Sequence, residues 1–469
     1  MQADTRKFDC TVNGPFELQV PCDESSYPSD TAESKFLCYK QCADMECGKI
    51  AAPRGENRTP AGAKLGVRKW AVPMTKLISD TDFIPTPKAL LARAKLRQPA
   101  MLRDLEKLVQ IESPSDNKAA VDHASGYVAR LFEEIGGKIR WRRQKRFGEL
   151  LEVRFQSQSR SQPSQKPVLL LGHLDTVWPI GSLKKMPFRV AKGRAFGPGI
   201  YDMKAGVLMM VHALAMLRES HSLHTPVIVL LNSDEEIGSP CSRPVTEKLA
   251  QECSAVFVLE PAQGFPGAYK TARKGVGEYS IRVHGVAAHS GVDFERGHSA
   301  ILELAKLIEK ISRFTDLKSG LTLNPGLICG GTRVNVTAAE AHAEIDVRIA
   351  KIRDAARVER LFRGLRSTDP ACTISVVGGI NRPPMERKDG TVRLFQRAKD
   401  LARDMGFTLE EASTGGGSDG NFTAALGIPT LDGMGAVGEG AHALHESILL
   451  NKWIERTALL TAMIAAHRP

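Results

Sequence analysis

Short apolar runs and longer helical segments alternate through the middle of the chain. Continuous apolar runs occupy residues 168–171, 227–231 and 255–259, and each has the length of a buried strand. Residues 203–217 are rich in Ala, Leu and Met and have the length of a helix. Continuous apolar strands separated by helices are typical of a mostly parallel sheet with helices on both faces. We therefore predict an α/β fold for this part of the chain.

The pattern changes near residue 274. Alternating polar and apolar residues, typical of half-exposed strands, now combine with helical segments. In chain order these segments are 278–283, 299–311, 341–349, 355–365 and 372–377. The order predicts a β-α-β-β-α-β unit, a ferredoxin-like four-stranded antiparallel sheet carrying two helices. We expect this small α+β domain, residues 274–383, to be inserted into a larger domain formed by residues 86–273 plus 384–469.

The first 85 residues lack either period and are rich in Pro, Ser, Asp and Gly, so we predict a flexible extension. Pro87 then suits the first turn of a helix. Five of the nine cysteines lie in the extension, at spacings that fit no standard zinc pattern: Cys10, Cys22, Cys38, Cys42 and Cys47. The other four are expected to be ordinary core residues: Cys241, Cys253, Cys329 and Cys372.

Composition limits the class of protein. A chain of 469 residues with 42% hydrophobic and 25% charged residues can bury a full core, in two or three domains. No apolar run reaches the length that spans a bilayer, and the first ten residues lack the apolar core of a signal peptide. We therefore expect a cytoplasmic location and no membrane partner.

The formal charge of +11 raises the question of a nucleic-acid partner. The densest basic run, residues 138–146, alternates as the solvated face of a strand does, and no nucleic-acid reader fold is recognisable. We predict no nucleic-acid binding. The surplus positive charge favours anionic small substrates.

Polar residues follow the predicted strands at their carboxyl ends, where open parallel sheets bind ligands. Others lie in a glycine-rich turn at residues 197–202 and after a glycine-rich loop that follows a predicted strand at 428–431. Together they supply two imidazoles and three carboxylates: His173, Asp202, Glu236, Glu260 and His442. Histidine nitrogens and carboxylate oxygens are ligands of catalytic zinc. The set predicts a site for two zinc ions.

These segments, in this order, resemble the zinc metallopeptidase family that contains carboxypeptidase G (glutamate carboxypeptidase), acetylornithine deacetylase, succinyl-diaminopimelate desuccinylase and aminoacylase. The resemblance covers residues 87–469. It implies that His173 and Glu260 hold one zinc, and that Glu236 and His442 hold the other. Asp202 would bridge the two ions. His445 is an alternative to His442, which Glu446, four residues further on, favours.

The resemblance also implies catalytic roles. Asp175 would orient the imidazole of His173, and Glu235 would act as general base. His289, within residues 285–291, is similar to a histidine that donates to the oxyanion in the active site of the partner subunit. The inserted domain would accordingly serve for dimerisation and as a lid, in a homodimer.

Substrate-binding residues follow from the same resemblance. Asn335 and Arg348 match positions that contact the substrate carboxylate, which the planar fork of arginine binds with two hydrogen bonds. Arg382, Gly416 and Gly417 resemble the glutamate carboxypeptidase branch. No Lys-Ser/Thr pair follows these glycines, which excludes a phosphate-binding loop.

The favoured function is a two-zinc hydrolase that cleaves the amide bond of an N-acyl amino acid or short peptide, as a carboxypeptidase that releases a C-terminal glutamate-like residue. Cobalt or manganese are alternatives to zinc. Two further hypotheses stay open: a deacylase of other N-acyl amino acids, similar to acetylornithine deacetylase, and a catalytically idle, metal-stabilised binding protein. The extension is alternatively a separate interaction module.

Overall fold

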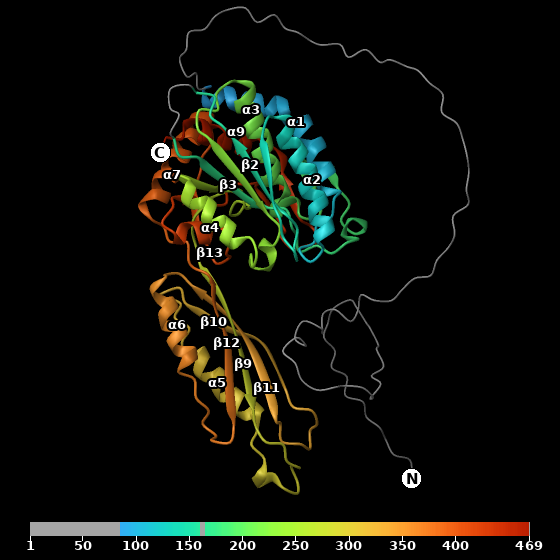
Figure 1. Ribbon diagram of the computed structural model, residues 1–469, viewed down its shortest axis with the longest axis vertical. Helices are drawn as coiled ribbons and strands as arrows, with labels where there is room; N and C mark the ends of the chain where they lie inside the picture. The colour runs from blue at the N-terminus through green and yellow to red at the C-terminus, as the bar shows by residue number, and fades with distance from the viewer. Residues whose placement is uncertain (1–84, 160–164, 469) are drawn as a thin grey trace, which may run out of the picture. The chain divides into compact units, whose positions relative to one another are not determined.

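The computed structural model describes residues 85–159 and 165–468, and the account below concerns this part of the chain (Figure 1). The predictions for the extension and its five cysteines fall outside the described residues. Helix α1 (Pro87–Val109) begins at the predicted place. The Oγ of the N-cap residue Thr86 accepts a hydrogen bond from the N–H of Ala89 at 3.3 Å, and Pro87 occupies the first turn.

A six-stranded sheet forms the centre of the larger part, in the order β1-β2-β6-β3-β7-β14. Neighbours from β6 to β14 are parallel, whereas β1 and β2 are antiparallel additions at one edge. The sheet is therefore mostly parallel, as predicted. Its strands are β1 (Lys138–Arg142), β2 (Leu150–Phe155), β3 (Val168–His173), β6 (Val227–Asn232), β7 (Ala255–Val258) and β14 (Thr430–Leu431).

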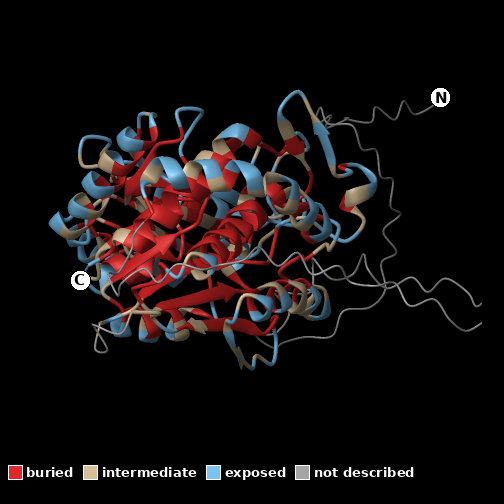
Figure 2. Ribbon diagram, turned by 90° about the horizontal axis from the view of Figure 1, so that it is seen from above, coloured by how far each residue is buried: buried red, intermediate tan, exposed pale blue. Residues whose placement is uncertain are grey.

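Helices cover both faces of this sheet, which explains why its strands are apolar without interruption. Leu170 points into the larger core with α1, α3 and α9, while Leu169 and Leu171 join a second core with α4 on the other face. Buried residues gather in the sheet and in the helices packed on it (Figure 2). Besides α1, the helices of this larger part are α2 (Lys118–Glu134), α3 (Ala205–Glu219), α4 (Arg243–Glu252), α7 (Asp389–Met405), α8 (Gly420–Ala425) and α9 (Leu450–Ala466).

Helix α3 corrects one expectation. The segment Ile200–Glu219 is long and apolar enough, by length and composition, to cross a membrane, although no such run was expected. In its apolar 18-residue window, 94% of the residues are buried within the protein, as in the core helix of a globular fold. The first turn of α3 also approaches the end of β7 closely, because a Cβ on Gly206 would lie 2.1 Å from the carbonyl oxygen of Leu259. Glycine is required there.

The second large sheet has the order β10-β11-β9-β12 and is antiparallel throughout. Helices α5 and α6 pack on it around a separate core, in which the rings of Tyr279 and Phe362 stack with centroids 3.7 Å apart. The predicted α+β unit is therefore present (Figure 1). Its elements are β9 (Gly275–His284), α5 (Ala300–Ser312), β10 (Thr322–Gly330), β11 (Glu340–Ile349), α6 (Arg353–Arg363) and β12 (Thr373–Arg382).

The exposed face of this sheet contradicts the expectation for one cysteine. Cys253 and Cys372 are buried as predicted, and Cys241 is half-buried. Cys329 is exposed on β10, with its Sγ 3.2 Å from Nε2 of His342, the residue opposite it on β11. A half-exposed strand places alternate residues in solvent, so cysteine content alone did not determine burial.

Two small sheets hold the loops around the strand ends. One has the order β15-β16-β5-β4, and the other pairs β8 with β13 in parallel. The first presents the loop that contains His442, and the second leads into the glycines that follow β13. Their strands are β4 (Arg189–Ala191), β5 (Arg194–Phe196), β8 (Tyr269–Arg273), β13 (Glu411–Thr414), β15 (Gly438–Glu439) and β16 (Ser447–Leu449).

Candidate active site

The predicted ligand residues come from three neighbouring strand ends. His173 is the last residue of β3, the turn containing Glu235 and Glu236 follows β6, and Glu260 lies two residues beyond β7. Strand β3 lies between β6 and β7 in the sheet. Because the carboxyl ends of parallel strands meet at one edge, the three segments emerge side by side, as the sequence predicted.

Asp202 lies between two pairs of ligand residues. Its Oδ1 is 3.3 Å from Nε2 of His173, which is also 3.5 Å from Oε1 of Glu260. Its Oδ2 is 3.6 Å from Nε2 of His442, which is 3.3 Å from Oε2 of Glu236. Each carboxylate oxygen of Asp202 therefore faces a different imidazole–carboxylate pair. This is the arrangement in which one aspartate bridges two cations.

The donor set fits divalent metal ions. The ligand atoms of His173, Asp202 and Glu236 lie within 4.8 Å of one another, and so do those of His173, Glu235 and Glu260. Among the described residues, the buried Oε1 of Glu236 has no hydrogen-bond partner. A buried carboxylate oxygen without a donor is costly unless a cation approaches it. Both this unpaired oxygen and the chemical identity of the side chains therefore suit a bound divalent cation.

The electrostatics of the cluster favour added positive charge. Hydrogen bonds to Asp202 and Glu236 raise the pKa of His442 to about 10. Burial opposes protonation of His173, but the neighbouring carboxylates raise its pKa well above the ordinary value. Burial raises the pKa of Glu236 to about 7, against the hydrogen bond from His442. Without a metal, the carboxylates therefore retain protons on the imidazoles, and bound cations would replace those protons.

Asp175 occupies the position that an orienting carboxylate needs. It is fully buried, and its Oδ1 lies 3.5 Å from Nδ1 of His173, whose Nδ1 is also 2.9 Å from the Asp175 carbonyl oxygen. The same carboxylate accepts the backbone N–H groups of Glu235 at 3.3 Å and Glu236 at 3.1 Å, and the hydroxyl of Ser115 at 2.7 Å. It therefore fixes the imidazole and the acidic turn relative to each other.

Glu446 joins the loop containing His442 to the turn that contains Asp202. Its Oε1 accepts the N–H groups of Tyr201 at 2.8 Å and Asp202 at 3.1 Å. Its Oε2 accepts the N–H of Gly199 at 2.9 Å and the indole N–H of Trp178 at 2.7 Å. The sequence had indicated Glu446 only as support for choosing His442 as the ligand, and it is His442 whose ring faces the carboxylates.

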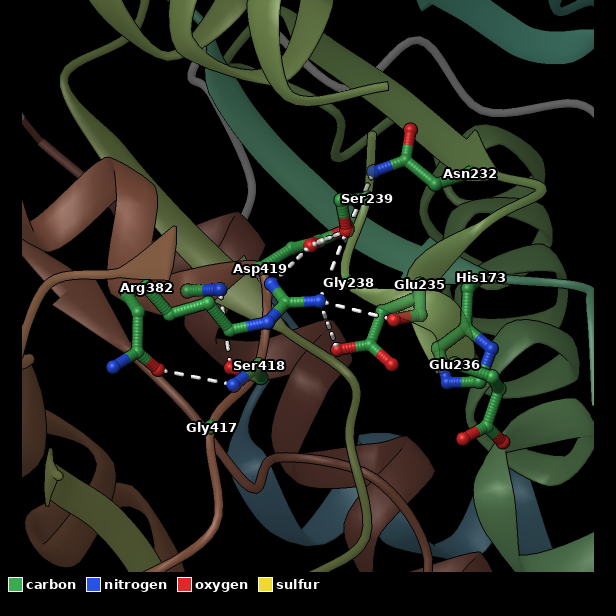
Figure 3. Close-up of polar contacts among 12 residues, drawn as sticks. His173, Asn232, Glu235, Glu236, Gly238, Ser239, Arg382, Gly417, Ser418 and Asp419 are labelled. Atoms are coloured by element: carbon green, nitrogen blue, oxygen red, sulfur yellow. Dashed lines mark hydrogen bonds and ion pairs between the residues drawn. The ribbon is translucent and has the colours of Figure 1, made fainter. Parts of the chain in front are cut away.

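Arg382 differs from its expectation. Its side chain is buried, with Nη2 3.0 Å from Oε1 of Glu235 and Nη1 2.6 Å from Oδ1 of Asp419 (Figure 3). The guanidinium, predicted to contact a substrate carboxylate, is bound to carboxylates of its own chain. Burial raises the pKa of Glu235 well above its ordinary value, although the positive charge of Arg382 opposes that rise.

Arg348 lies beside the glycine loop. Arg348 is half-buried on β11, with Nη2 2.9 Å from Oδ1 of Asp346 and Nη1 donating to the carbonyl oxygen of Gly415 at 3.3 Å. The carbonyl oxygens of Gly416 and Gly417 accept hydrogen bonds from Nη1 of a different arginine, Arg273, at 3.2 and 3.0 Å.

Sequence reasoning missed Arg273. This buried residue makes two hydrogen bonds with Asp432, at 2.8 and 2.7 Å, and its Nη2 is 3.6 Å from Oε2 of Glu260. It connects a predicted metal ligand to the glycine loop. Arg273 is the last residue of β8, so the strand-end rule would have indicated it had that strand been recognised.

His289 and Asn335 lie together but apart from the metal ligands. Both are exposed, His289 forms a β-bridge with Val336, and the carbonyl oxygen of Asn335 accepts the N–H of Ser290 at 3.0 Å. They follow the far ends of β9 and β10. The ten residues of β9 extend roughly 30 Å from the Arg273 end at about 3.3 Å per residue. One chain alone does not bring these two residues to the cluster.

Comparison with known proteins identifies the family. Residues 169–466 match the model of Peptidase family M20/M25/M40, which is more than half of the chain. The chain belongs to this family. The resemblance noted from the sequence is confirmed. The protein is an M20-family hydrolase that contains the mostly parallel six-stranded sheet and the four-stranded antiparallel sheet described above.

Two curated relatives share much of the chain. Carboxypeptidase G2 from Pseudomonas sp. (strain RS-16) is 29% identical over 378 residues, which is 80% of this chain and 90% of the relative. Succinyl-diaminopimelate desuccinylase from Stenotrophomonas maltophilia is 28% identical over 305 residues, 61% of this chain and 80% of the relative.

A solved structure is similar in fold. The YXEP protein of Bacillus subtilis, a dinuclear metal binding peptidase from the M20 family, aligns with a TM-score of 0.58 and 15% identity. The alignment covers 79% of this chain and 98% of that chain. At this identity the likeness supports the fold alone.

Proposed function

We propose that this M20-family hydrolase uses two zinc ions to cleave the amide bond of an N-acyl amino acid or short peptide, and that it is a carboxypeptidase releasing a C-terminal glutamate-like residue. The observation that carries the proposal is Asp202, whose two oxygens each face a separate imidazole–carboxylate pair. An aspartate in that position serves two cations at once.

The ligands divide into two sets. His173 and Glu260 would hold one ion, Glu236 and His442 the other, with Asp202 shared. When bound, such ions polarise the scissile carbonyl and lower the pKa of water. The mixture of nitrogen and oxygen ligands suits zinc, and cobalt and manganese are the alternatives to test.

Glu235 would move the proton. Its buried carboxylate lies with the ligand atoms of His173 and Glu260, all within 4.8 Å of one another. In this proposal a carboxylate oxygen of Glu235 accepts a proton from the attacking water and returns it to the leaving amide nitrogen. A carboxyl group whose pKa is raised by burial is a better base than an exposed one. Its presence argues against a catalytically idle protein.

The substrate carboxylate would be bound beside the glycine loop. Arg348 is half-buried and reaches solvent there, since its side chain retains 32% of its accessible surface. Asp346, its partner, is itself 41% exposed, so a substrate carboxylate can replace it at modest cost. The 29% identity to carboxypeptidase G2 supports a substrate with a free C-terminal carboxylate.

A homodimer would complete the site. His289 and Asn335 lie together beyond the far end of β9, where they are exposed and remote from their own ligand cluster. We propose that a second copy of the chain receives them at its active site, His289 as oxyanion donor and Asn335 on the substrate carboxylate. The α+β sheet then serves as the dimerisation and lid domain.

The test is a matched pair of substrates, N-acyl-glutamate and its α-amide, offered to zinc-loaded protein. Cleavage of the acid with no measurable cleavage of the amide is expected, because only the acid presents a carboxylate to Arg348. Equal cleavage of both would contradict the carboxypeptidase assignment. Cobalt- and manganese-loaded protein, assayed in parallel, decides the choice of metal.

A deacylase is the second candidate, favoured by the 28% identity to succinyl-diaminopimelate desuccinylase. It shares the metal ligands and Glu235 but prefers other side chains. A panel of N-acetyl and N-succinyl derivatives of basic and neutral amino acids distinguishes the two. Faster turnover of those derivatives than of N-acyl-glutamate would establish the deacylase.

A further inference from the structure

Arg382 is enclosed by its own chain. It is 5% exposed and its guanidinium lies over the ring of Phe422, with Cζ 4.8 Å from the centroid. Gly417 also packs closely against the aliphatic part of this side chain, since a Cβ at Gly417 would lie 2.9 Å from Cδ of Arg382. The space around this side chain is filled by protein rather than open to a substrate.

Both terminal nitrogens of Arg382 bind oxygens of the same chain (Figure 3). Nη1 binds Oδ1 of Asp419 at 2.6 Å. Nη2 donates hydrogen bonds to the carbonyl oxygen of Glu235 at 3.0 Å and to Oγ of Ser239 at 2.9 Å, and it forms an ion pair with Oε1 of Glu235 at 3.0 Å. Arg382 therefore fixes both the main chain and the carboxylate of Glu235.

The same network encloses the whole acidic turn. Asp419 also accepts the side-chain amide of Asn232 at 2.6 Å, and the hydroxyl of Ser239. Asn232 is the last residue of β6, shortly before the turn Glu235–Ile237, and Ser239 lies two residues after that turn. The turn is thus held at its beginning, at its end and at Glu235 by one buried arginine–aspartate pair.

Transfer of Arg382 to a substrate carboxylate would leave Asp419 and Glu235 without their cation. Removing one partner from a buried ion pair is strongly unfavourable, because the remaining charge is desolvated and unpaired. Arg348 carries no such penalty, since it is a third exposed and its partner Asp346 reaches solvent. The two arginines, which flank Val276 on neighbouring strands, therefore have different surroundings and different tasks.

We propose that Arg382 is a positioning residue for Glu235, not a residue that binds the substrate carboxylate. It holds the Glu235 carboxylate beside the metal ligands by a direct ion pair and fixes the turn through Ser239 and Asp419. Because Arg382 is the last residue of β12, it also connects the α+β sheet to Glu235, the proposed general base. The inference rests on the proposed role of Glu235 as general base, and it leaves substrate-carboxylate binding to Arg348.

The first experiment separates kcat from KM, with wild type, Arg382→Lys and Arg348→Lys assayed on N-acyl-glutamate and its α-amide. Lysine keeps the charge but cannot bind Glu235, Ser239 and Asp419 together. For Arg382→Lys we expect kcat to fall by roughly 10- to 100-fold, with KM and the preference for the acid within about threefold of wild type. Arg348→Lys should raise KM for the acid and weaken that preference.

A matched control tests whether any substitution of an arginine around Phe422 and the end of β12 lowers kcat. Arg243 also lies over the ring of Phe422, with Cζ 4.6 Å from the centroid, and donates to the carbonyl oxygen of Asn381, next to Arg382. It makes none of the contacts of Arg382 with Glu235 or Asp419 in the described residues. Arg243→Lys should leave kcat within about twofold of wild type, whereas a loss equal to that of Arg382→Lys would overturn the proposal.

A double-mutant cycle tests the route of the effect. If Arg382 acts through the Glu235 carboxylate, Arg382→Lys should lower kcat little further in a Glu235→Gln background. Additive losses would overturn the proposal. So would an Arg382→Lys enzyme with wild-type kcat, raised KM and no preference for the acid, because that result makes Arg382 the substrate-binding arginine.

The same cycle measured on unfolding requires no turnover. Denaturant midpoints of the four metal-loaded variants should be non-additive, because the pair is in contact in the folded state. If wild type cleaves neither substrate while the midpoints are coupled, the proposed function has failed and the contact stands. If the midpoints are additive, the positioning proposal has failed whatever the protein cleaves.

Discussion

The metal-ligand cluster and the segment around His289 and Asn335 differ in how their polar side chains are held. In the cluster, Asp175 and Glu446 each accept several backbone N–H groups and are fully buried. Around His289 the side chains are exposed, and its Nδ1 accepts only the N–H of Gly291, at 3.1 Å, in the described structure.

The difference separates two kinds of function. A metal site must be preorganised, because its ligands have to point at the positions of the cations, so buried supports hold them in place. A residue that acts in a partner subunit must instead be exposed in its own chain. The first region is therefore assembled within one chain, whereas the second region would acquire its role only in the proposed homodimer. The following experiments break or sharpen this contrast.

The largest effect is expected from removing the shared ligand. Asp202→Ala should lose both metal ions and all measurable turnover, since each oxygen of Asp202 faces one of the two imidazoles. Metal content by plasma mass spectrometry checks this. Asp346→Ala, which removes a carboxylate in the other sheet, should keep both ions. Retention of full metal content by Asp202→Ala would show that Asp202 is not the bridge.

Neighbouring glutamates should then behave differently. Glu235→Gln should lower kcat by a factor on the order of 10² to 10⁴ with metal content unchanged, because it removes the base but no ligand. Glu236→Gln should lose metal from the set that includes His442. The paired measurements are kcat and metal stoichiometry. Loss of metal from Glu235→Gln, or wild-type turnover in it, would contradict the assigned roles.

Metal binding should strengthen as pH rises. The metal-free pKa of His442 is about 10 and that of Glu236 about 7, and a metal binds only the deprotonated forms. Protons therefore compete below these values. Apparent affinity should rise about tenfold per pH unit between pH 7 and 9, and more steeply below pH 7. Titrations at several pH values check the slope; an affinity independent of pH would contradict it.

Complementation between subunits gives the smallest and most selective effect. His289→Ala and Glu235→Gln proteins should each be impaired. Mixed and allowed to exchange subunits, they should recover about a quarter of wild-type activity, because half of the dimers then contain one site with both residues intact. Covalently coupled hybrid dimers provide the control. If mixing restores nothing while hybrids form, His289 does not act in the partner's site.

The sequence by itself was sufficient to predict the strand ends and the polar residues that gather there. Continuous apolar runs specify buried parallel strands, and the residues that follow them, such as His173, Glu236 and Glu260, meet at one sheet edge whatever the detailed packing. The β-α-β-β-α-β order likewise determined the second sheet, because strand and helix periods are local properties.

The tertiary structure alone decided how the buried charges are paired. Arg382 contacts Glu235 across 147 positions of sequence, and Arg273 contacts Asp432 across 159. No local pattern distinguishes an arginine that will bind a substrate from one that will be buried against a carboxylate. The sequence also did not determine that the long apolar helix α3 is buried within the protein or that Cys329 is exposed. Period and propensity determine elements and their faces, whereas buried ion pairs depend on which elements pack together, and that is set by the whole fold.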